Sequence, residues 1–243
     1  MVNLDSFQPH MRVAIIGASG GLGQAFADLL SQSPHHIGHV YQLSRRPLDG
    51  HLFIDLDDEA SIANAAENIA QDGALDLVIN ATGMLHHTEK NITPEKTWRH
   101  LDPQNMMASY QANCIAPVMA AKHFLPLMRR DGKSVYAVLS ARVGSIADNR
   151  VGGWHSYRAA KAGLNMIIRN LALEMALKSP DAIVMGLHPG TVATDLSAPF
   201  RGMVKHDVFT PEESAGYLLK LINDAGQDHS GHQWAWDGAK IPG

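Results

Sequence analysis

The sequence predicts an α/β fold with a doubly wound parallel sheet of about seven strands and helices on both faces. Short apolar runs alternate along the chain with segments whose apolar residues recur at helical spacing. The first run, residues 12–16, stops at a glycine turn that leads directly into a helical pattern. Such alternation is typical of right-handed βαβ crossovers. We expect one domain over residues 1–243, whose residues 1–10 form an N-terminal extension.

Composition narrows the classes of function. The chain has 243 residues, 45% of them hydrophobic and 18% charged, and a net charge of −4, which favours a small-molecule partner over nucleic acid. No apolar run reaches the roughly 18 residues of a membrane span, and the single Cys114 excludes an internal disulfide. We therefore expect a cytoplasmic protein that binds no membrane. The fourteen histidines show no metal-binding spacing, so no metal site is predicted.

The glycine turn after the first strand indicates a phosphate site. Glycines let the backbone approach a pyrophosphate, and the first amides of the following helix donate to its oxygens. A tight turn without a ligand is the alternative, but strand, turn and helix in this order favour the nucleotide. The expected cofactor-binding residues here are Gly17, Ser19, Gly20, Gly21, Leu22 and Gly23. The fold is accordingly Rossmann-like.

The second predicted strand, residues 40–43, ends in Ser44, Arg45 and Arg46. An acid about 20 positions beyond the glycines would accept from a ribose 2′-hydroxyl, whereas arginine accommodates a 2′-phosphate. No acid stands here, and two guanidiniums with a serine suit a phosphate monoester. The cofactor expected is therefore NADP(H), unless the two arginines are simply solvated.

Further strands are predicted at 52–54, 75–79, 135–139, 182–187 and 233–236, and a helix with a capping box at Thr210. Ligands of doubly wound sheets bind beyond the carboxyl ends of strands. Ser44, Asp55 and Asn80 all lie at such ends, so they are expected in the cofactor site.

A long helical segment is predicted from Pro103 to Met128, and Pro117 should kink or break it. Asn113 lies four residues earlier, so its carbonyl loses its helical donor and could hold an ordered water. The alternative is an asparagine that faces solvent.

The most informative stretch is Tyr157 to Lys161, which lies at the start of a predicted helix that ends before Pro180. Residues four apart share one helix face. A fixed cation beside a phenol favours the phenolate, so Lys161 is expected to lower the pKa of Tyr157 towards neutrality. An ordinary solvated pair is the alternative.

Together these residues resemble the short-chain dehydrogenase/reductase family over essentially the whole chain, most closely its C-factor-type and sniffer-like carbonyl reductase branch. The resemblance implies an NADP-dependent oxidoreductase that moves a hydride between nicotinamide and a carbonyl or secondary alcohol. Tyr157 would be the general acid/base, Lys161 would tune it and bind the nicotinamide ribose, and Asn113 would hold a water. The cofactor site that the resemblance implies also includes Tyr157 and the following residues: Leu56, Ala81, Thr82, Gly83, Pro189, Gly190, Val192 and Thr194. The alternative is a C-factor-like signalling protein with weak or no turnover.

The chain departs from that family where a serine normally holds the substrate oxygen. Counting back from Gly144 places Ala141 at this position. Ser140 is the expected catalytic donor, with Ser145, or no serine at all, left open. Pocket residues are expected at Met84, Trp154, His155 and 196–206, within a substrate-covering segment at 195–210. The resemblance also allows a homodimer or homotetramer.

Overall fold

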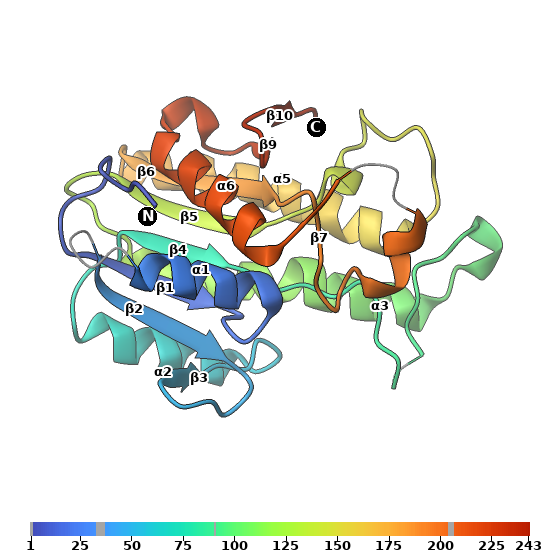
Figure 1. The fold of residues 1–243 in the computed structure, drawn as a ribbon, viewed down its shortest axis with the longest axis horizontal. Coiled ribbons are helices and arrows are strands. Elements are labelled where there is room, and N and C mark those ends of the chain that lie inside the picture. Colours follow the sequence, from blue (N-terminus) through green and yellow to red (C-terminus); the bar gives the residue numbers. More distant parts are fainter. Residues whose placement is uncertain (1, 33–36, 90, 204–206) are drawn as a thin grey trace.

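The computed structural model describes residues 2–32, 37–89, 91–203 and 207–243. Its centre is an eight-stranded sheet in the order β10-β9-β6-β5-β4-β1-β2-β3 (Figure 1). All neighbouring strands are parallel except the edge pair β9 and β10. The predicted sheet class is therefore confirmed, with one antiparallel edge strand that the sequence reading did not include. The strands are β1 Met11–Ile16, β2 Ile37–Ser44, β3 His51–Phe53, β4 Leu77–Asn80, β5 Ser134–Leu139, β6 Ala182–His188, β9 Gln233–Ala235 and β10 Lys240–Ile241.

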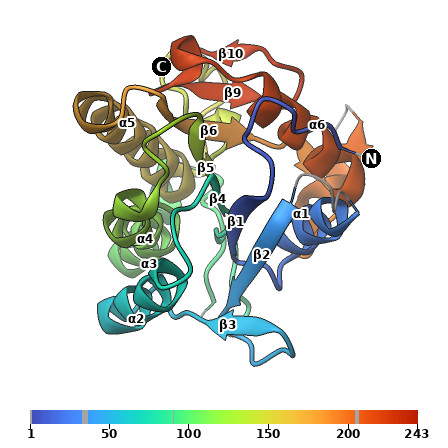
Figure 2. The ribbon, with the colours of Figure 1, turned by 90° about the vertical axis from the view of Figure 1, so that its left-hand side faces the viewer.

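Helices cover both faces of the sheet, as Figure 2 shows when the sheet is seen end-on. On one face lie α1 and α6, and on the other lie α2, α3, α4 and α5. The α-helices are α1 Gly21–Ser31, α2 Glu59–Ala70, α3 Pro103–Tyr110, α4 Ala116–Phe124, α5 His155–Lys178 and α6 Pro211–Asp224. Thr210 forms the predicted capping box with Glu213 at the start of α6.

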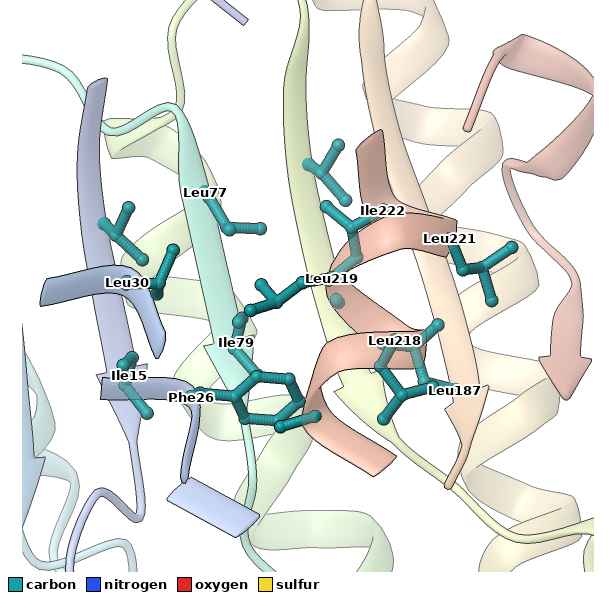
Figure 3. Close-up of a cluster of buried hydrophobic side chains, with 14 of the residues drawn as sticks. Ile15, Phe26, Leu30, Leu77, Ile79, Leu187, Leu218, Leu219, Leu221 and Ile222 are labelled. Atoms are coloured by element: carbon teal, nitrogen blue, oxygen red, sulfur yellow. The ribbon is translucent and has the colours of Figure 1, made fainter. Parts of the chain in front are cut away.

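Two buried clusters hold these layers to the sheet. Between the sheet and α1 with α6, side chains such as Ile15, Phe26, Ile79 and Leu219 interlock (Figure 3). A second cluster packs α2, α4 and α5 against the opposite face. Both faces of β1, β4, β5 and β6 are consequently buried, which explains their nearly continuous apolar sequences.

The N-terminal extension packs against this core. Leu4 is fully buried and Phe7 nearly so, both in the cluster beneath α6. The amide of Ser6 donates to Asn223 at the end of α6, and the ammonium of Lys133 donates to the Ser6 hydroxyl. Residues 2–10 therefore lie outside the sheet but contribute to the core.

The long helical segment is interrupted one turn earlier than expected. A π-helical turn, Gln111–Ile115, separates α3 from α4, and Pro117 lies in the first turn of α4. The amide of Ala116 donates to the carbonyl of Gln111, five residues back. Because proline has no amide to donate to Asn113, the wider turn accommodates it without an abrupt break.

Candidate active site

A cavity of about 600 Å³ opens at the carboxyl ends of the strands. It is continuous from the glycine turn after β1 to the first turn of α5. Most of the predicted site residues line it: Ser19, Gly20, Gly21, Leu22, Arg46, Ala81, Thr82, Gly83, Ser140, Tyr157, Lys161, Pro189, Gly190, Val192 and Thr194. Gly17, Gly23, Ser44, Arg45, Asp55, Leu56, Asn80 and Asn113 do not.

The glycine turn is shaped by contacts that exclude side chains. A Cβ at Gly23 would stand 2.1 Å from the carbonyl oxygen of Gly17, and one at Gly21 would stand 2.7 Å from Thr194 Cγ2. Gly17 itself has φ of 88°, a conformation that favours glycine. Gly17 and Gly23 thus form the base of the turn, while Gly21 presents bare backbone to the cavity and to the segment after β6.

Only one of the three residues expected at a cofactor phosphate faces the cavity. Arg46 lines it, whereas the Ser44 hydroxyl donates to the Arg46 carbonyl at 2.7 Å. The exposed Arg45 lies 4.0 Å from an Asp55 oxygen and 3.9 Å from one of Asp57. Ser44 therefore supports the loop, and Arg45 is directed towards two acids.

The side chains of Asn80 and Asn113 form hydrogen bonds that hold the segment after β4 in place. The Asn80 side-chain oxygen accepts from the amide and hydroxyl of Thr82, at 3.2 and 2.6 Å, and so shapes the turn after β4. Asn113 is fully buried, which excludes the solvent-facing alternative. Its side chain accepts from the Met84 amide and donates to the Met84 carbonyl and to the Ser109 carbonyl. The π turn is thereby joined to the loop that follows β4.

Tyr157 and Lys161 both line the cavity from the first turns of α5. The buried Lys161 ammonium lies 5.8 Å from the Tyr157 ring centroid and donates to the carbonyl of Leu139 at 2.9 Å. Desolvation lowers the pKa of Lys161 to about 8, and burial raises the pKa of the Tyr157 phenol. The expected lowering of the Tyr157 pKa is therefore wrong for this structure, because the ammonium is bonded to β5 and burial dominates at the phenol.

Neither candidate serine has a free hydroxyl hydrogen for a substrate oxygen. Ser140 donates to Asn165 Oδ1 at 2.7 Å, and the Asn165 amide donates to Gln233. Ser145 is buried, donates to the carbonyl of Pro242 and accepts from the Asp148 amide. Ala141 does line the cavity. This geometry favours the third alternative, in which no serine serves as donor.

The buried Glu95, which the sequence did not single out, fixes the start of α5. Its carboxylate accepts from the amide and the hydroxyl of Ser156, and its carbonyl accepts from the amide of Trp154. Trp154 adopts a left-handed conformation with φ of 49° and makes no side-chain cap. Glu95 therefore supplies the cap from a distant loop, a contact that no local sequence pattern reveals.

Aromatic side chains form the wall beyond Tyr157. Trp154 lies 6.3 Å from Tyr157 and 5.3 Å from Phe200, measured between ring centroids. The segment 195–210, which was expected to cover a substrate, contributes Asp195, Leu196, Ser197 and Phe200 to the lining, while residues 204–206 lie outside the described part. Of the other expected pocket residues, Trp154 lines the cavity, Met84 lines a separate, much smaller one, and His155 lines neither.

Several lining residues were missed although their positions carried a signal. Arg142 and Val143 follow the end of β5, and His188 ends β6. The rule that ligands bind beyond the carboxyl ends of strands applies to these positions as well. Within residues 2–32, 37–89, 91–203 and 207–243, no group of three or more His, Cys, Asp or Glu side chains could hold a metal ion. In the same ranges no helix is long and apolar enough to cross a membrane.

Three comparisons place this geometry among known proteins. Residues 11–205 match the family model described as short chain dehydrogenase. A 1-hydroxy-2-glutathionyl-2-methyl-3-butene dehydrogenase from Rhodococcus sp. is 31% identical over 187 residues, which are 76% of this chain and 76% of that protein. C-signal from Myxococcus xanthus is 29% identical over 58% of this chain and 81% of its own length.

Solved structures share the fold over nearly the whole chain. An NADPH-bound carbonyl reductase from chicken fatty liver has a TM-score of 0.82 at 24% identity, covering 98% of this chain and 96% of that one. The carbonyl reductase Sniffer of D. melanogaster also has a TM-score of 0.82, at 21% identity, covering 97% and 100%. The sheet order and the glycine turn are consistent with the family match over residues 11–205. The chain therefore belongs to the short-chain dehydrogenase family.

Proposed function

We propose that the protein is an NADP-dependent carbonyl reductase that uses Tyr157 as its general acid/base. The observation that carries this proposal is that one cavity joins the glycine turn, Arg46, Tyr157 and Lys161. A dinucleotide needs such an extended site, with a phosphate end and a reactive end. The chicken relative of similar fold is named as NADPH-bound, which agrees with an arginine at the phosphate end.

The residues present fit this cofactor. The first amides of α1 would hold the pyrophosphate, because they point out of the helix end beside the cavity. Gly20 and Gly21 leave the backbone there bare, and a Cβ at Gly21 would collide with Thr194. Arg46 would accommodate a 2′-phosphate. Bound NADPH would supply the hydride. The rest of the reaction falls to the protein, which must orient the substrate carbonyl and deliver a proton to its oxygen.

Tyr157 is suited to hold that proton. Burial raises its pKa, so the phenol stays protonated at neutral pH and is ready to donate to a developing alkoxide. Lys161 would contact the cofactor ribose from the next turn of the same helix. Asn113 would contribute by fixing the loop at Met84.

Two titrations and a substrate screen test the proposal. NADPH should bind more tightly than NADH by fluorescence titration, and the preference should decrease at higher salt. Arg46→Ala should remove most of the preference, whereas the matched Arg45→Ala should have a smaller effect because Arg45 lies outside the cavity. Equal affinities for the two cofactors would refute the assignment.

The screen uses aldehydes and ketones with NADPH. Tyr157→Phe should keep cofactor affinity and lose reduction by at least about a thousandfold, since phenylalanine has no proton to donate. Full activity of this variant would contradict the mechanism. The melting temperature and the NADPH affinity of the same Tyr157→Phe sample are the control, because wild-type values of both show that the variant is folded and binds its cofactor.

A signalling role like that of C-signal is the second candidate, and the lack of a serine donor favours it. Ala141 lines the cavity, and both neighbouring serines donate elsewhere. A protein whose cofactor occupancy matters more than its turnover would not need that donor. Tight NADPH binding without reduction of any carbonyl in the screen would support this candidate.

A further inference from the structure

Arg142 stands on a rigid support at the reactive end of the cavity. It opens the 3-10 turn Arg142–Gly144 that follows β5, and this turn packs on the first turns of α5. A Cβ at Gly144 would lie 2.8 Å from Lys161 Cβ, and Arg158 donates to the carbonyl of Val143. The backbone that carries Arg142 is thus held directly against the helix of Tyr157.

The Arg142 side chain is itself braced on one edge. Its Nε donates to Asp148 Oδ2 at 2.6 Å, and this bond lowers the pKa of Asp148, so the carboxylate persists. The Asp148 amide donates to the buried Ser145 hydroxyl. Among the described residues, the two terminal nitrogens of Arg142 have no hydrogen-bond partner. A guanidinium held in this way presents a planar pair of donors.

Of the positively charged side chains that line the cavity, Arg142 is the one best placed to bind a substrate. The apolar residues Val143, Trp154 and Phe200 line the same cavity as Arg142. Lys161 is buried and donates to Leu139. Arg46 follows β2, three strands away from β5 in the sheet, which corresponds to about 14 Å. Asp195 is the one acidic residue that lines the cavity among those described, and its side chain, like that of Arg142, is exposed to solvent.

We propose that Arg142 is an anion subsite that makes the enzyme prefer carbonyl substrates carrying a carboxylate next to an apolar body. This inference rests on the proposed reductase function and names its substrate class. The carboxylate would pair with the two terminal nitrogens of Arg142, and the apolar body would lie against Trp154 and Phe200. Ser145 then has a role that differs from the one the sequence suggested: it holds Asp148, which holds Arg142.

The test compares two aldehydes of nearly equal shape, 4-carboxybenzaldehyde and its neutral methyl ester. The measured quantity is the ratio of kcat/KM for the acid to kcat/KM for the ester. Wild type should favour the acid, and Arg142→Gln should lower the ratio by about ten- to hundredfold, as expected for a charge-assisted pair. Arg142→Met should do the same, and both variants are checked for unchanged melting temperature.

Arg150→Gln is the matched control. Arg150 lies in the same loop but donates to the carbonyls of Ala147 and Asn149 and does not line the cavity. The ratio should stay at its wild-type value in this variant. A wild-type preference for the ester, or an equal loss of the ratio in Arg142→Gln and Arg150→Gln, would overturn the subsite.

A binding measurement separates this inference from the proposed function. If neither aldehyde is reduced, the reductase assignment fails, and calorimetric titration of the NADPH-loaded protein with the same two compounds decides on the subsite. Tighter binding of the acid that is lost in Arg142→Gln would support it. Equal binding of acid and ester would overturn it. If the ester is reduced and the acid is not favoured, the subsite fails while the reductase assignment stands.

Discussion

At the scale of single residues, the site is dominated by what burial does to charged and polar groups. Lys161 is enclosed between α5 and β5, and among the described residues its ammonium donates only to the Leu139 carbonyl. An amine in this position is destabilising as a cation, which lowers its pKa. Such groups are kept for chemistry rather than for stability.

Lys161→Met should therefore stabilise the fold and abolish reduction. The pKa of Lys161 falls from 10.5 to about 8 on folding, so the unfolded chain binds the extra proton between these values. Wild-type stability should rise as pH increases from about 8 to 10.5, and at pH 7 the variant should gain about 1–3 kcal/mol. Urea unfolding at pH 7 and pH 10 measures both quantities.

Lys133 has a pKa lowered in the same direction but is present in both proteins, so the difference between wild type and variant isolates Lys161. A stability gap that stays constant from pH 7 to pH 10 would contradict the assignment of the low pKa to Lys161.

Ala141→Ser should raise turnover. The Ala141 side chain lines the cavity, and a hydroxyl there would donate to the substrate oxygen that Ser140 and Ser145 do not reach with their own hydrogens. A preorganised donor of this kind is worth about a hundredfold in rate, so a gain in kcat of about tenfold or more is expected. Steady-state kinetics on the best carbonyl of the screen measures it. If Ser140 were the donor instead, Ser140→Ala would lower kcat and Ala141→Ser would leave it unchanged.

At the scale of elements, the glycine turn and the start of α5 show two ways of fixing a helix end. α1 begins at Gly21 after the N-cap residue Gly20, which has no side chain to cap it, and its first turn packs against the Gly17 carbonyl. The start of α5 is capped from outside by Glu95. One end leaves amides free for a ligand, while the other is closed so that Tyr157 is held in place.

Gly23→Ala should disrupt the first of these ends. Its Cβ would stand 2.1 Å from the Gly17 oxygen, so α1 must move, and we expect a loss of about 2 kcal/mol or more together with weak NADPH binding. Gly216→Ala is the control, because no atom lies within 4 Å of its Cβ and alanine favours the interior of α6. The control should gain up to about 1 kcal/mol. Thermal unfolding and NADPH titration on both variants provide the comparison.

At the scale of the whole molecule, the cavity joins segments that are distant in sequence. Residues after β1, β2, β4, β5 and β6 line it together with Phe200 from the 3-10 segment Ala198–Met203. Phe200 also contacts His86 in the segment after β4, with ring centroids 5.9 Å apart. A cofactor that contacts all of these segments binds only the folded chain, so its binding raises the free energy of unfolding of the whole fold.

NADPH at about one hundred times its dissociation constant should stabilise the protein by about 2.7 kcal/mol, or roughly 5–10 °C in melting temperature. NADH at the same concentration should give a smaller shift. Thermal unfolding followed by circular dichroism with each cofactor measures the difference. Identical shifts for the two cofactors would contradict the phosphate role of Arg46.

The sequence by itself determined the layers and the place of the site. Apolar periodicity predicted the order of strands and helices, because buried parallel strands need continuous apolar runs and the helices that cover them need one apolar face. Parallel strands deliver their carboxyl ends to one edge of the sheet, so the cavity residues after Ile16, Asn80 and Leu139 were largely foreseeable.

Only the tertiary structure decided where each hydrogen bond goes. Ser140 and Ser44 lie at the predicted strand ends, yet their hydroxyls donate to Asn165 and to Arg46. Lys161 shares a helix face with Tyr157 as predicted, but its ammonium donates to Leu139, and burial reverses the expected direction of the Tyr157 pKa. Local patterns determine on which element, and on which face of it, a side chain lies. Its hydrogen-bond partners and its dielectric surroundings come from segments that are distant in the chain and become neighbours only on folding.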